Sequence, residues 1–487
     1  MRRSVAVSAA VCVLAGGVLV GCAPTTGPGD PVLCEYSQPF VPPSPTVLRQ
    51  PARPPAQPSA STDVVINLAD TRPTISGLRL GDSTGAPLAE VNAALAVAQV
   101  TSVRPVFGAG SADELGGYVR VTTPSSVSSN HLVAALGTLG GVIDARLASV
   151  AAPPPTVSAP ATSTPCLASA QSFFGVSPDG LGIEASRTWP GATGANVSIV
   201  DVEYSWNVNH EDLSAARAPG ALISVGVPSD PFGDYNHGTA VLGVLVGDSN
   251  AYGINGIVPA AQMHMVNAVE VLGYQGAAAV ATATASLHPG DVILIEQQAY
   301  GINGDLVPSE WALDFYDAVK AATDAGINVV EAAANGGVNL DDPAYGPVFP
   351  AGRPDSGAIM VGAGAACGSA PERSRLYFSN YGTRVDVQAE GECVTTSGYG
   401  DLINGGANST YTAGFNGTSS ATALVGGVTA ALSSAWKQAR GTAASPATIR
   451  NILVASGVAQ DMTLEAGHIG PRPNLAAALA LIATWVE

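Results

Sequence analysis

The chain has 487 residues, a formal net charge of −18, and 38 acidic side chains against 20 basic ones. A chain of this length is expected to form two or three domains, and its excess of carboxylates excludes nucleic acid as a partner because phosphate would be repelled. The excess lies in one part of the chain, since residues 161–487 hold 29 acidic and 11 basic side chains whereas residues 1–160 hold 9 of each.

The first 22 residues have the features of an export signal. Arg2 and Arg3 precede an apolar run from Val5 to Val20, and that run is shorter than the roughly 20 residues that span a bilayer. The run ends in Leu19-Val20-Gly21-Cys22, which resembles a bacterial lipobox whose cysteine is acylated. We therefore expect residues 1–22 to be a lipoprotein signal peptide and the exported protein to be lipid-anchored at Cys22 on the outer face of the cell membrane. An ordinary secreted protein is the alternative.

A stalk and a small domain are predicted next. Residues 23–62 are rich in Pro, Ser and Thr, a composition typical of an extended stalk. Residues 63–150 instead alternate apolar strands with two helical segments, in the βαββαβ order of a small ferredoxin-like α+β domain. The predicted strands are Val64–Leu68, Gln99–Phe107, Tyr118–Thr123 and Val142–Ser149, and the predicted helices are Ala86–Ala98 and Asn130–Thr138.

A second linker, residues 151–172, separates this domain from the rest and begins with a Pro-rich run. Residues 173–487 alternate strands and helices, which predicts an α/β domain with a mostly parallel sheet flanked by helices. The apolar run Leu475–Val486 is too short to span a bilayer and is predicted to be a final helix. The other expected elements are strands at Val197–Val202, Gln262–Ala268, Val292–Ile295, Asn328–Ala333 and Ala358–Gly362, and helices at Ala240–Val246, Trp311–Ala325 and after Ser419.

Four cysteines lie beyond the predicted signal peptide: Cys34, Cys166, Cys367 and Cys393. Four thiols in an exported protein predict two disulfides, for which three connectivities are possible. Cys367 with Cys393 is the simplest pair because they are close in sequence, and Cys34 with Cys166 then follows. The alternatives pair Cys34 with Cys367 or Cys393, or leave Cys34 free. The spacing does not suggest zinc.

Three polar residues stand in motifs typical of a nucleophilic serine site. Asp201 ends an apolar strand, His237 opens a helix within His-Gly-Thr, and Ser419 lies in Gly-Thr-Ser-Ser before a run of small residues. A serine hydroxyl becomes a nucleophile when an imidazole takes its proton and a carboxylate fixes the tautomer of that imidazole. Each residue alone has an ordinary explanation, namely a turn aspartate, a structural histidine and a helix N-cap serine.

Together, and in the order Asp, His, Ser, these motifs resemble those of subtilisin-family (subtilase) serine endopeptidases, and the resemblance runs from about Gly180 to the C-terminus. It implies a subtilisin-like fold and hydrolysis of peptide bonds by a triad of Asp201, His237 and Ser419. It also implies that Asn335, which follows an apolar strand, is the oxyanion-hole donor; a turn asparagine is the alternative. The matching segments are Val197–Asp201 with His210–Leu213, Asn236–Gly243, Val329–Gly336 and Asn416–Ala421.

The chain also departs from the family pattern, so substrate preference cannot be carried over. The alternative to an active endopeptidase is a catalytically inactive subtilase-fold protein that serves as a binding module on the cell surface. A non-proteolytic serine hydrolase is disfavoured because the chain lacks the Gly-x-Ser-x-Gly elbow of that class. The departures are Val202-Glu203 after the aspartate, Ala334 where the family has glycine, Ala423 where it has proline, and Glu296 and Gln298 where small residues line the cleft.

The resemblance further implies a structural calcium ion. The segment from His237 to Pro259 aligns without a gap and places residues 248–254 on the calcium-binding loop of the family. Ligation by oxygen alone suits Ca²⁺, although an ordinary polar loop is the alternative. The implied ligands are the side chains of Asp212 and Asn250 and the carbonyls of Asp248, Tyr252 and Ile254.

Residues 63–150 resemble the propeptide of the family in position, size and element order. The resemblance implies a zymogen in which this domain assists folding, inhibits the enzyme and is removed by self-processing in the 151–172 linker. We expect a monomer that acts on peptide or protein substrates.

Overall fold

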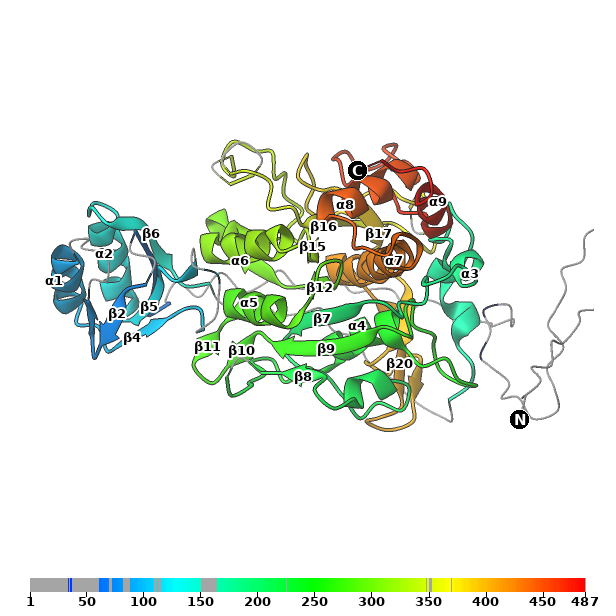
Figure 1. Cartoon of the computed structure of the whole chain (residues 1–487), viewed down its shortest axis with the longest axis horizontal. Helices are drawn as coiled ribbons and strands as arrows, with labels where there is room; N and C mark the ends of the chain where they lie inside the picture. The colour runs from blue at the N-terminus through cyan, green and yellow to red at the C-terminus, as the bar shows by residue number, and fades with distance from the viewer. Residues whose placement is uncertain are drawn as a thin grey trace, which may run out of the picture.

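The structure is a computed structural model, shown in Figure 1. Within the part of the chain that it describes, no helix has the length and hydropathy needed to cross a bilayer. The predicted signal peptide, most of the stalk and the first part of the 151–172 linker lie outside the described residues. Those residues are 34, 36, 61–69, 72–81, 88–108, 112, 115–149, 164–224, 226–346, 348–349, 353–368 and 370–486.

The small domain is built on one antiparallel sheet of four strands in the order β4-β5-β1-β6. Helices α1 and α2 pack on one face of this sheet around Ile66, Leu95 and Leu132. α2 begins at Ser126, four residues before the predicted start, because the Ser125 hydroxyl accepts the Ser128 amide and caps the helix. The elements are β1 (Asp63–Leu68), the hairpin β2 (Thr74–Ser76) and β3 (Arg79–Gly81), α1 (Ala89–Val97), β4 (Ser102–Pro105), β5 (Tyr118–Thr122), α2 (Ser126–Leu136) and β6 (Val142–Leu147).

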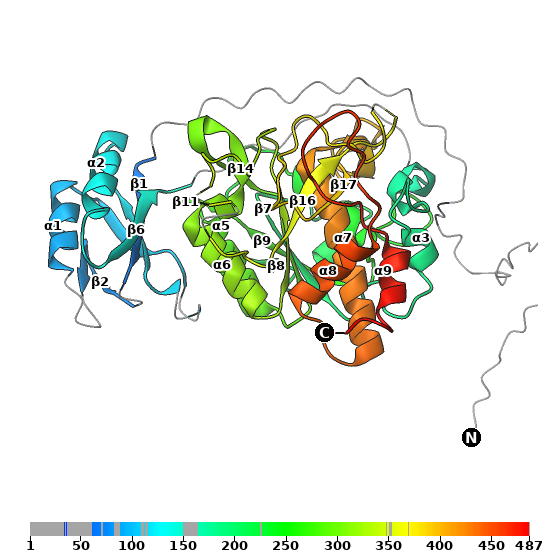
Figure 2. The ribbon, with the colours of Figure 1, turned by 90° about the horizontal axis from the view of Figure 1, so that it is seen from above.

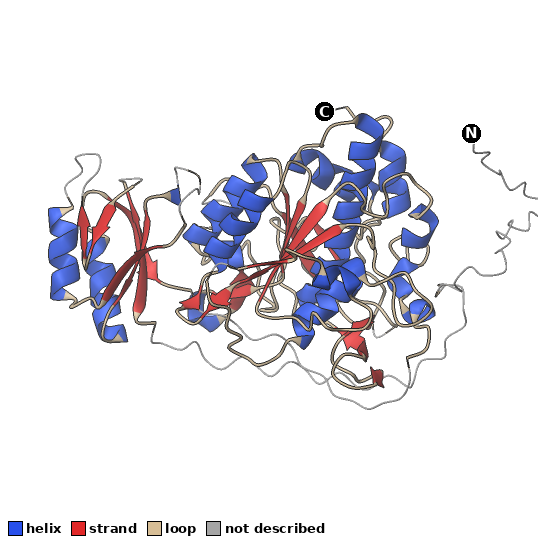
Figure 3. Ribbon diagram, turned by 60° about the horizontal axis from the view of Figure 1, so that its bottom comes forward, coloured by secondary structure: helices blue, strands red, loops and turns tan. Residues whose placement is uncertain are grey.

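The large domain has a sheet of seven parallel strands in the order β17-β16-β15-β12-β7-β9-β8. Figure 3 shows helices on both faces of this sheet, so the predicted α/β architecture is confirmed. The strands are β7 (Ser198–Glu203), β8 (Leu222–Ile223), β9 (Gln262–Asn267), β12 (Val292–Ile295), β15 (Asn328–Ala332), β16 (Ile359–Gly364) and β17 (Val387–Glu390).

Two helix layers bury alternate residues of each strand. The layer with α4 (Asn236–Val246) and α7 (Gly417–Arg440) covers Ile199 and Leu294. The layer with α5 (Gly276–Ser286) and α6 (Leu313–Asp324) covers Val200 and Ile293. Because side chains alternate along a strand, Asp201 and Glu203 face the layer that contains α4 and α7. The remaining helices are α3 (Ile183–Ser186), α8 (Pro446–Ser456) and α9 (Leu475–Leu481).

Smaller elements surround this core. The hairpin β13–β14 follows β12, and the hairpin β10–β11 follows β9. The sheet β18-β20-β19 leads directly into α7. Their bounds are β10 (Val269–Glu270), β11 (Gly273–Tyr274), β13 (Gln298–Tyr300), β14 (Leu306–Pro308), β18 (Val394–Ser397), β19 (Ile403–Asn404) and β20 (Thr410–Phe415), with 3-10 turns at Ala168–Ala170, Ser172–Phe174, Ser214–Arg217, Ile302–Gly304 and Ser309–Trp311.

The small domain lies against α5, α6 and the β10–β11 hairpin, as Figures 1 and 2 show. Basic side chains of the small domain contact acidic groups and carbonyls of the large one, in keeping with the charge difference between the two parts of the sequence. Arg146 Nη2 lies 2.7 Å from Asp314 Oδ1 in the first turn of α6, and Arg120 Nη1 donates to the Tyr274 carbonyl at 2.9 Å.

Both disulfides have the expected connectivity, Cys34 with Cys166 and Cys367 with Cys393. Cys34 is buried, and its backbone is held by the large domain. Its amide donates to the Asn250 carbonyl at 2.6 Å, and its carbonyl accepts from Asn255 Nδ2 at 2.9 Å. The residues on both sides of the small domain are thus fixed on the same loop of the large domain.

Candidate active site

The starts of α4 and α7 and the end of β7 supply the three central side chains. Glu203 is the last residue of β7, His237 the second residue of α4 and Ser419 the third residue of α7. The two helices pack in one layer, and the His237 ring meets the Phe415 ring edge-on at 5.6 Å, just before α7 begins. All three residues are at most 4% exposed.

The carboxylate that contacts the imidazole is Glu203. His237 Nδ1 lies 2.5 Å from Glu203 Oε2, and Glu203 Oε1 accepts the Tyr204 amide at 2.7 Å. Asp201, the carboxylate expected at this position, instead accepts from Trp206 Nε1 at 2.7 Å. The structure therefore does not bring Asp201 into hydrogen-bond contact with His237.

The length of β7 explains this difference. The sequence predicts Asp201 at the end of a strand over Val197–Val202, but β7 continues to Glu203, two residues beyond Asp201 on the same face. The residue at the strand end is the one that reaches the start of α4, because a step of two residues along a strand is about 6–7 Å. The sequence signal for Glu203 is a second acid two positions after Asp201, where the family pattern has none.

The His237 ring is prepared to accept a proton. Burial lowers the pKa of this imidazole, but the Glu203 carboxylate, by charge and by hydrogen bond, and then Asp201 raise the pKa above its usual value. Nε2 is buried and has no hydrogen-bond partner among the described residues. It is the free nitrogen of an imidazole whose other nitrogen is fixed by a carboxylate, the arrangement that general-base catalysis needs.

Ser419 lies in the first turn of a helix of 24 residues. The free backbone N–H groups and the positive end of the helix dipole favour negative charge at this position. Gly417 enters the helix with φ of 94°, a conformation that side chains other than glycine adopt rarely. This glycine lets the chain turn from β20 into α7 beside Asn335.

Asn335 is held at both ends of its side-chain amide. Oδ1 accepts the Thr418 amide at 2.8 Å and the Thr418 hydroxyl at 3.1 Å. The backbone N–H of Asn335 donates to Gln298 Oε1 at 3.0 Å, and the side-chain Nδ2 donates to the same atom at 3.3 Å. One of the two Nδ2 hydrogens is engaged, which leaves the second N–H for a ligand next to Ser419.

The residue before Asn335 carries backbone strain. Ala334 has φ of 74°, and a left-handed conformation costs a non-glycine residue roughly 1–2 kcal/mol. Asn380 offsets this strain, because its amide donates to the Ala334 carbonyl and its Nδ2 donates to the Ala333 carbonyl at 2.7 Å. The fixed turn aims Asn335 toward the start of α7.

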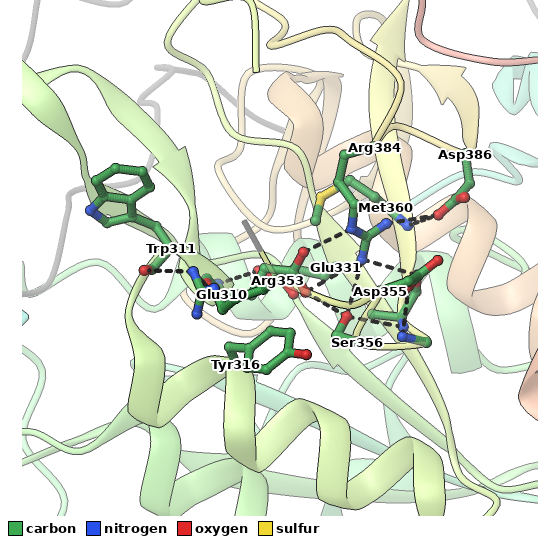
Figure 4. A network of polar contacts seen from close by, with 12 residues as sticks. Glu310, Trp311, Tyr316, Glu331, Arg353, Asp355, Ser356, Met360, Arg384 and Asp386 are labelled. Atoms are coloured by element: carbon green, nitrogen blue, oxygen red, sulfur yellow. Dashed lines mark hydrogen bonds and ion pairs between the residues drawn. The ribbon is translucent and has the colours of Figure 1, made fainter. Parts of the chain in front are cut away.

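A buried polar network holds β15, the strand that leads to Asn335, as Figure 4 shows. Glu331 of β15 accepts the Glu310 amide at 2.9 Å. Glu310 in turn pairs with Arg384 through two hydrogen bonds of 2.8 and 3.3 Å. Because breaking a buried ion pair leaves an uncompensated charge, this network fixes the strand from which Asn335 extends.

The loop expected to bind calcium is closed by hydrogen bonds. Asp212 accepts from Asn250 Nδ2 at 2.6 Å and from the Ile254 amide at 2.8 Å. Asn250 Oδ1 accepts the Tyr252 amide at 2.8 Å, which leaves Nδ2 to face the carboxylate. Asp248 is bound by the Ser214 hydroxyl at 2.6 Å.

Two N–H groups are directed at the Asp212 carboxylate, so these residues as placed do not offer a calcium ion an all-oxygen site. Burial raises the pKa of Asp212 to about 8. No group of three or more His, Cys, Asp or Glu side chains suited to a metal occurs in the described ranges. Calcium binding at this loop stays a prediction from the resemblance.

Chelation tests this loop directly. If hydrogen bonds alone satisfy Asp212, a chelator should leave the melting temperature of the full chain unchanged. Asn250→Ala should lower the free energy of unfolding by about 1–3 kcal/mol, with and without chelator, since a buried acceptor loses its donor. A fall in wild-type melting temperature on chelation that is missing in Asn250→Ala would establish a calcium site here instead.

The chain is similar to known proteins of one family. Residues 193–468 match the model of the subtilase family. The chain is 31% identical over 238 residues to M-protease of Shouchella clausii, covering 49% of this chain and 53% of that one. It is also 31% identical to subtilisin BL of Lederbergia lenta over 238 residues, covering 49% of this chain and 76% of that one.

A solved structure extends the likeness in fold. Fervidolysin from Fervidobacterium pennivorans, described as a keratinolytic enzyme related to subtilisin, aligns with a TM-score of 0.53 at 19% identity, covering 88% of this chain and 62% of that one. The chain spans about half the length of the first curated relatives it matches.

Proposed function

Because the chain belongs to the subtilase family, we propose that it is a serine endopeptidase whose triad is Ser419, His237 and Glu203. The observation that carries this proposal is the 2.5 Å contact between His237 Nδ1 and Glu203, which leaves Nε2 free in the helix layer that holds Ser419. Asp201, the acid expected from the sequence, has no direct contact with the imidazole in this assignment.

Each group then has a role in acyl transfer. The Ser419 hydroxyl attacks the carbonyl carbon of a peptide bond while His237 Nε2 takes its proton, and Glu203 stabilises the resulting imidazolium. The oxyanion is stabilised by the N–H groups at the start of α7 and by the free Nδ2 hydrogen of Asn335. The imidazolium next protonates the leaving amine, and water resolves the acyl-enzyme by the same steps in reverse.

Labelling with a fluorophosphonate probe tests this function. We expect covalent labelling of the processed protein on Ser419, located by peptide mass analysis, and no labelling of Ser419→Ala or His237→Ala. Ser420→Ala, in which the neighbouring hydroxyl is lost, is the matched control and should label normally. A folded wild type that does not react would favour the inactive binding module expected as the alternative.

We also propose that residues 63–150 are a propeptide that inhibits the enzyme. Their sheet packs on α5 and α6, and Arg146 and Arg120 bind groups at the starts of these helices. Cleavage within residues 151–172 by the same triad would then release inhibition. Peptides or proteins are the substrates in this proposal, and export, with a lipid anchor at Cys22, remains a prediction from the signal sequence.

A further inference from the structure

Two buried carboxyl groups beside the proposed triad have no role in it. Asp201 and Glu296 are 0% and 4% exposed. The pairing of β7 with β12 sets Leu294 opposite Asp201 and Ile295 opposite Val202, so that Glu296 follows next to Glu203. The three acids therefore lie on the face of the sheet that α4 and α7 cover.

The hydrogen bonds of these acids are incomplete. Trp206 Nε1 donates to Oδ2 of Asp201. Oδ1 of Asp201 and both carboxyl oxygens of Glu296 are buried without an N–H or O–H donor among the described residues. A buried acceptor without a donor is costly, and the only hydrogen that the two groups can share is a proton on one of them. The two carboxyl groups are close enough for each to shift the pKa of the other, and a proton held between them would meet that need.

The surroundings keep such a proton in place. Burial, followed by the charge of Glu203, raises the pKa of Asp201 to about 7, and burial, followed by the charge of Asp201, raises the pKa of Glu296. Burial also raises the pKa of Tyr274 and Tyr399, so both phenols are neutral. The other polar groups around the two acids are His237 in α4, Asp234 just before α4, Asn267 on β9 and Ser419 on α7.

We propose that Asp201 and Glu296 share one buried proton, which Glu296 carries and donates to a charged Asp201, and that this single negative charge beside the His237–Glu203 pair sets the pH at which the imidazole becomes a base. A nearby negative charge favours the imidazolium, so loss of the charge makes His237 release its proton at lower pH. Both acids are positioning residues in this scheme. The catalytic consequence rests on the proposed function, whereas the shared proton does not.

The titration of His237 tests the shared proton without turnover. The full chain carrying Ser419→Ala is labelled with ¹⁵N-histidine, and the His237 signals are assigned by their loss in His237→Gln. Asp201→Asn should lower the titration midpoint by about 1–3 pH units, the range typical of a neighbouring charge. Glu296→Gln keeps a donor to a charged Asp201 and should shift the midpoint by less than about half a unit.

Equal shifts in the two variants would overturn the proposal, because the acids would then ionise separately. The absence of a shift in Asp201→Asn would overturn it as well. If Asp201→Asn does not fold, Glu296→Gln is compared with Glu296→Leu. Only leucine removes the donor, so only leucine should lower the melting temperature and move the midpoint, and identical behaviour would refute the shared proton.

Activity provides the separate test of the catalytic consequence. In chains that retain Ser419, the acidic limb of the pH profile of kcat/KM should move to lower pH in Asp201→Asn by the same amount as the midpoint. If the midpoint moves and the limb does not, the general-base role of His237 fails while the shared proton stands.

Discussion

Glu203→Gln should lower kcat by about 10⁴ with little change in KM, the loss typical of a triad whose carboxylate is replaced by an amide. An amide at this position presents an N–H group or a neutral oxygen to Nδ1, so it neither fixes the required tautomer nor stabilises the imidazolium. Steady-state kinetics on a peptide substrate with processed enzyme measures the effect. Because self-processing is expected to slow equally, the variant is processed by added wild-type enzyme.

Asp201→Asn is the matched control, since it makes the same chemical change two residues earlier on the same strand face. Measured at the optimum pH of each variant, it should retain kcat within about tenfold of wild type, because Asp201 bonds to Trp206 and does not contact the imidazole. The reverse pattern, with a large loss in Asp201→Asn and a small one in Glu203→Gln, would restore Asp201 as the triad acid.

The sequence predicts the architecture well because hydrophobic patterning and element order determine it. The alternation of strands and helices after residue 173 is enough to predict a parallel sheet with two helix layers, and the structure has both. Disulfide pairing followed from proximity in sequence, and it is confirmed. Such inferences need only the local pattern and the order of elements.

The site is less predictable because it depends on a few ångströms. Whether Asp201 or Glu203 meets His237 is decided by where β7 ends, and strand ends are the least predictable part of an element. The clamp of Gln298 and Thr418 on Asn335 joins residues 37 and 83 positions away in sequence. No local motif contains that information.

The calcium loop shows the same limit. Its residues align without a gap, yet Asn250 presents its N–H group to Asp212. That orientation follows from the Tyr252 amide, which takes the oxygen of Asn250. Alignment identifies which residues are near one another, while the hydrogen-bond partners decide which atoms face a ligand.

A cut within residues 151–165 of the linker should mature the enzyme without separating its two pieces. Cys34 and Cys166 are bonded across 132 positions of sequence, an interval that contains the whole small domain and residues 151–165. The loop around Gly253 holds both ends, because Gly253 accepts the Leu167 amide at 2.7 Å and the Asn250 carbonyl accepts the Cys34 amide at 2.6 Å. Cleavage would therefore leave the stalk and the small domain attached to the large domain.

On gels of processed protein we accordingly expect one band without reductant and two pieces with it. Ser419→Ala, which cannot process itself, should give one band in both lanes. Cys34→Ser should give two pieces in both lanes, and if Cys22 is acylated its large domain should leave the membrane fraction on processing.

Attachment through the disulfide also keeps the inhibitor at high local concentration, so the processed Cys34→Ser enzyme should lose inhibition on dilution more readily than wild type. Two separate pieces from processed wild type without reductant would contradict the tether, because the bond between Cys34 and Cys166 is the only covalent link across the cut in the described part of the chain.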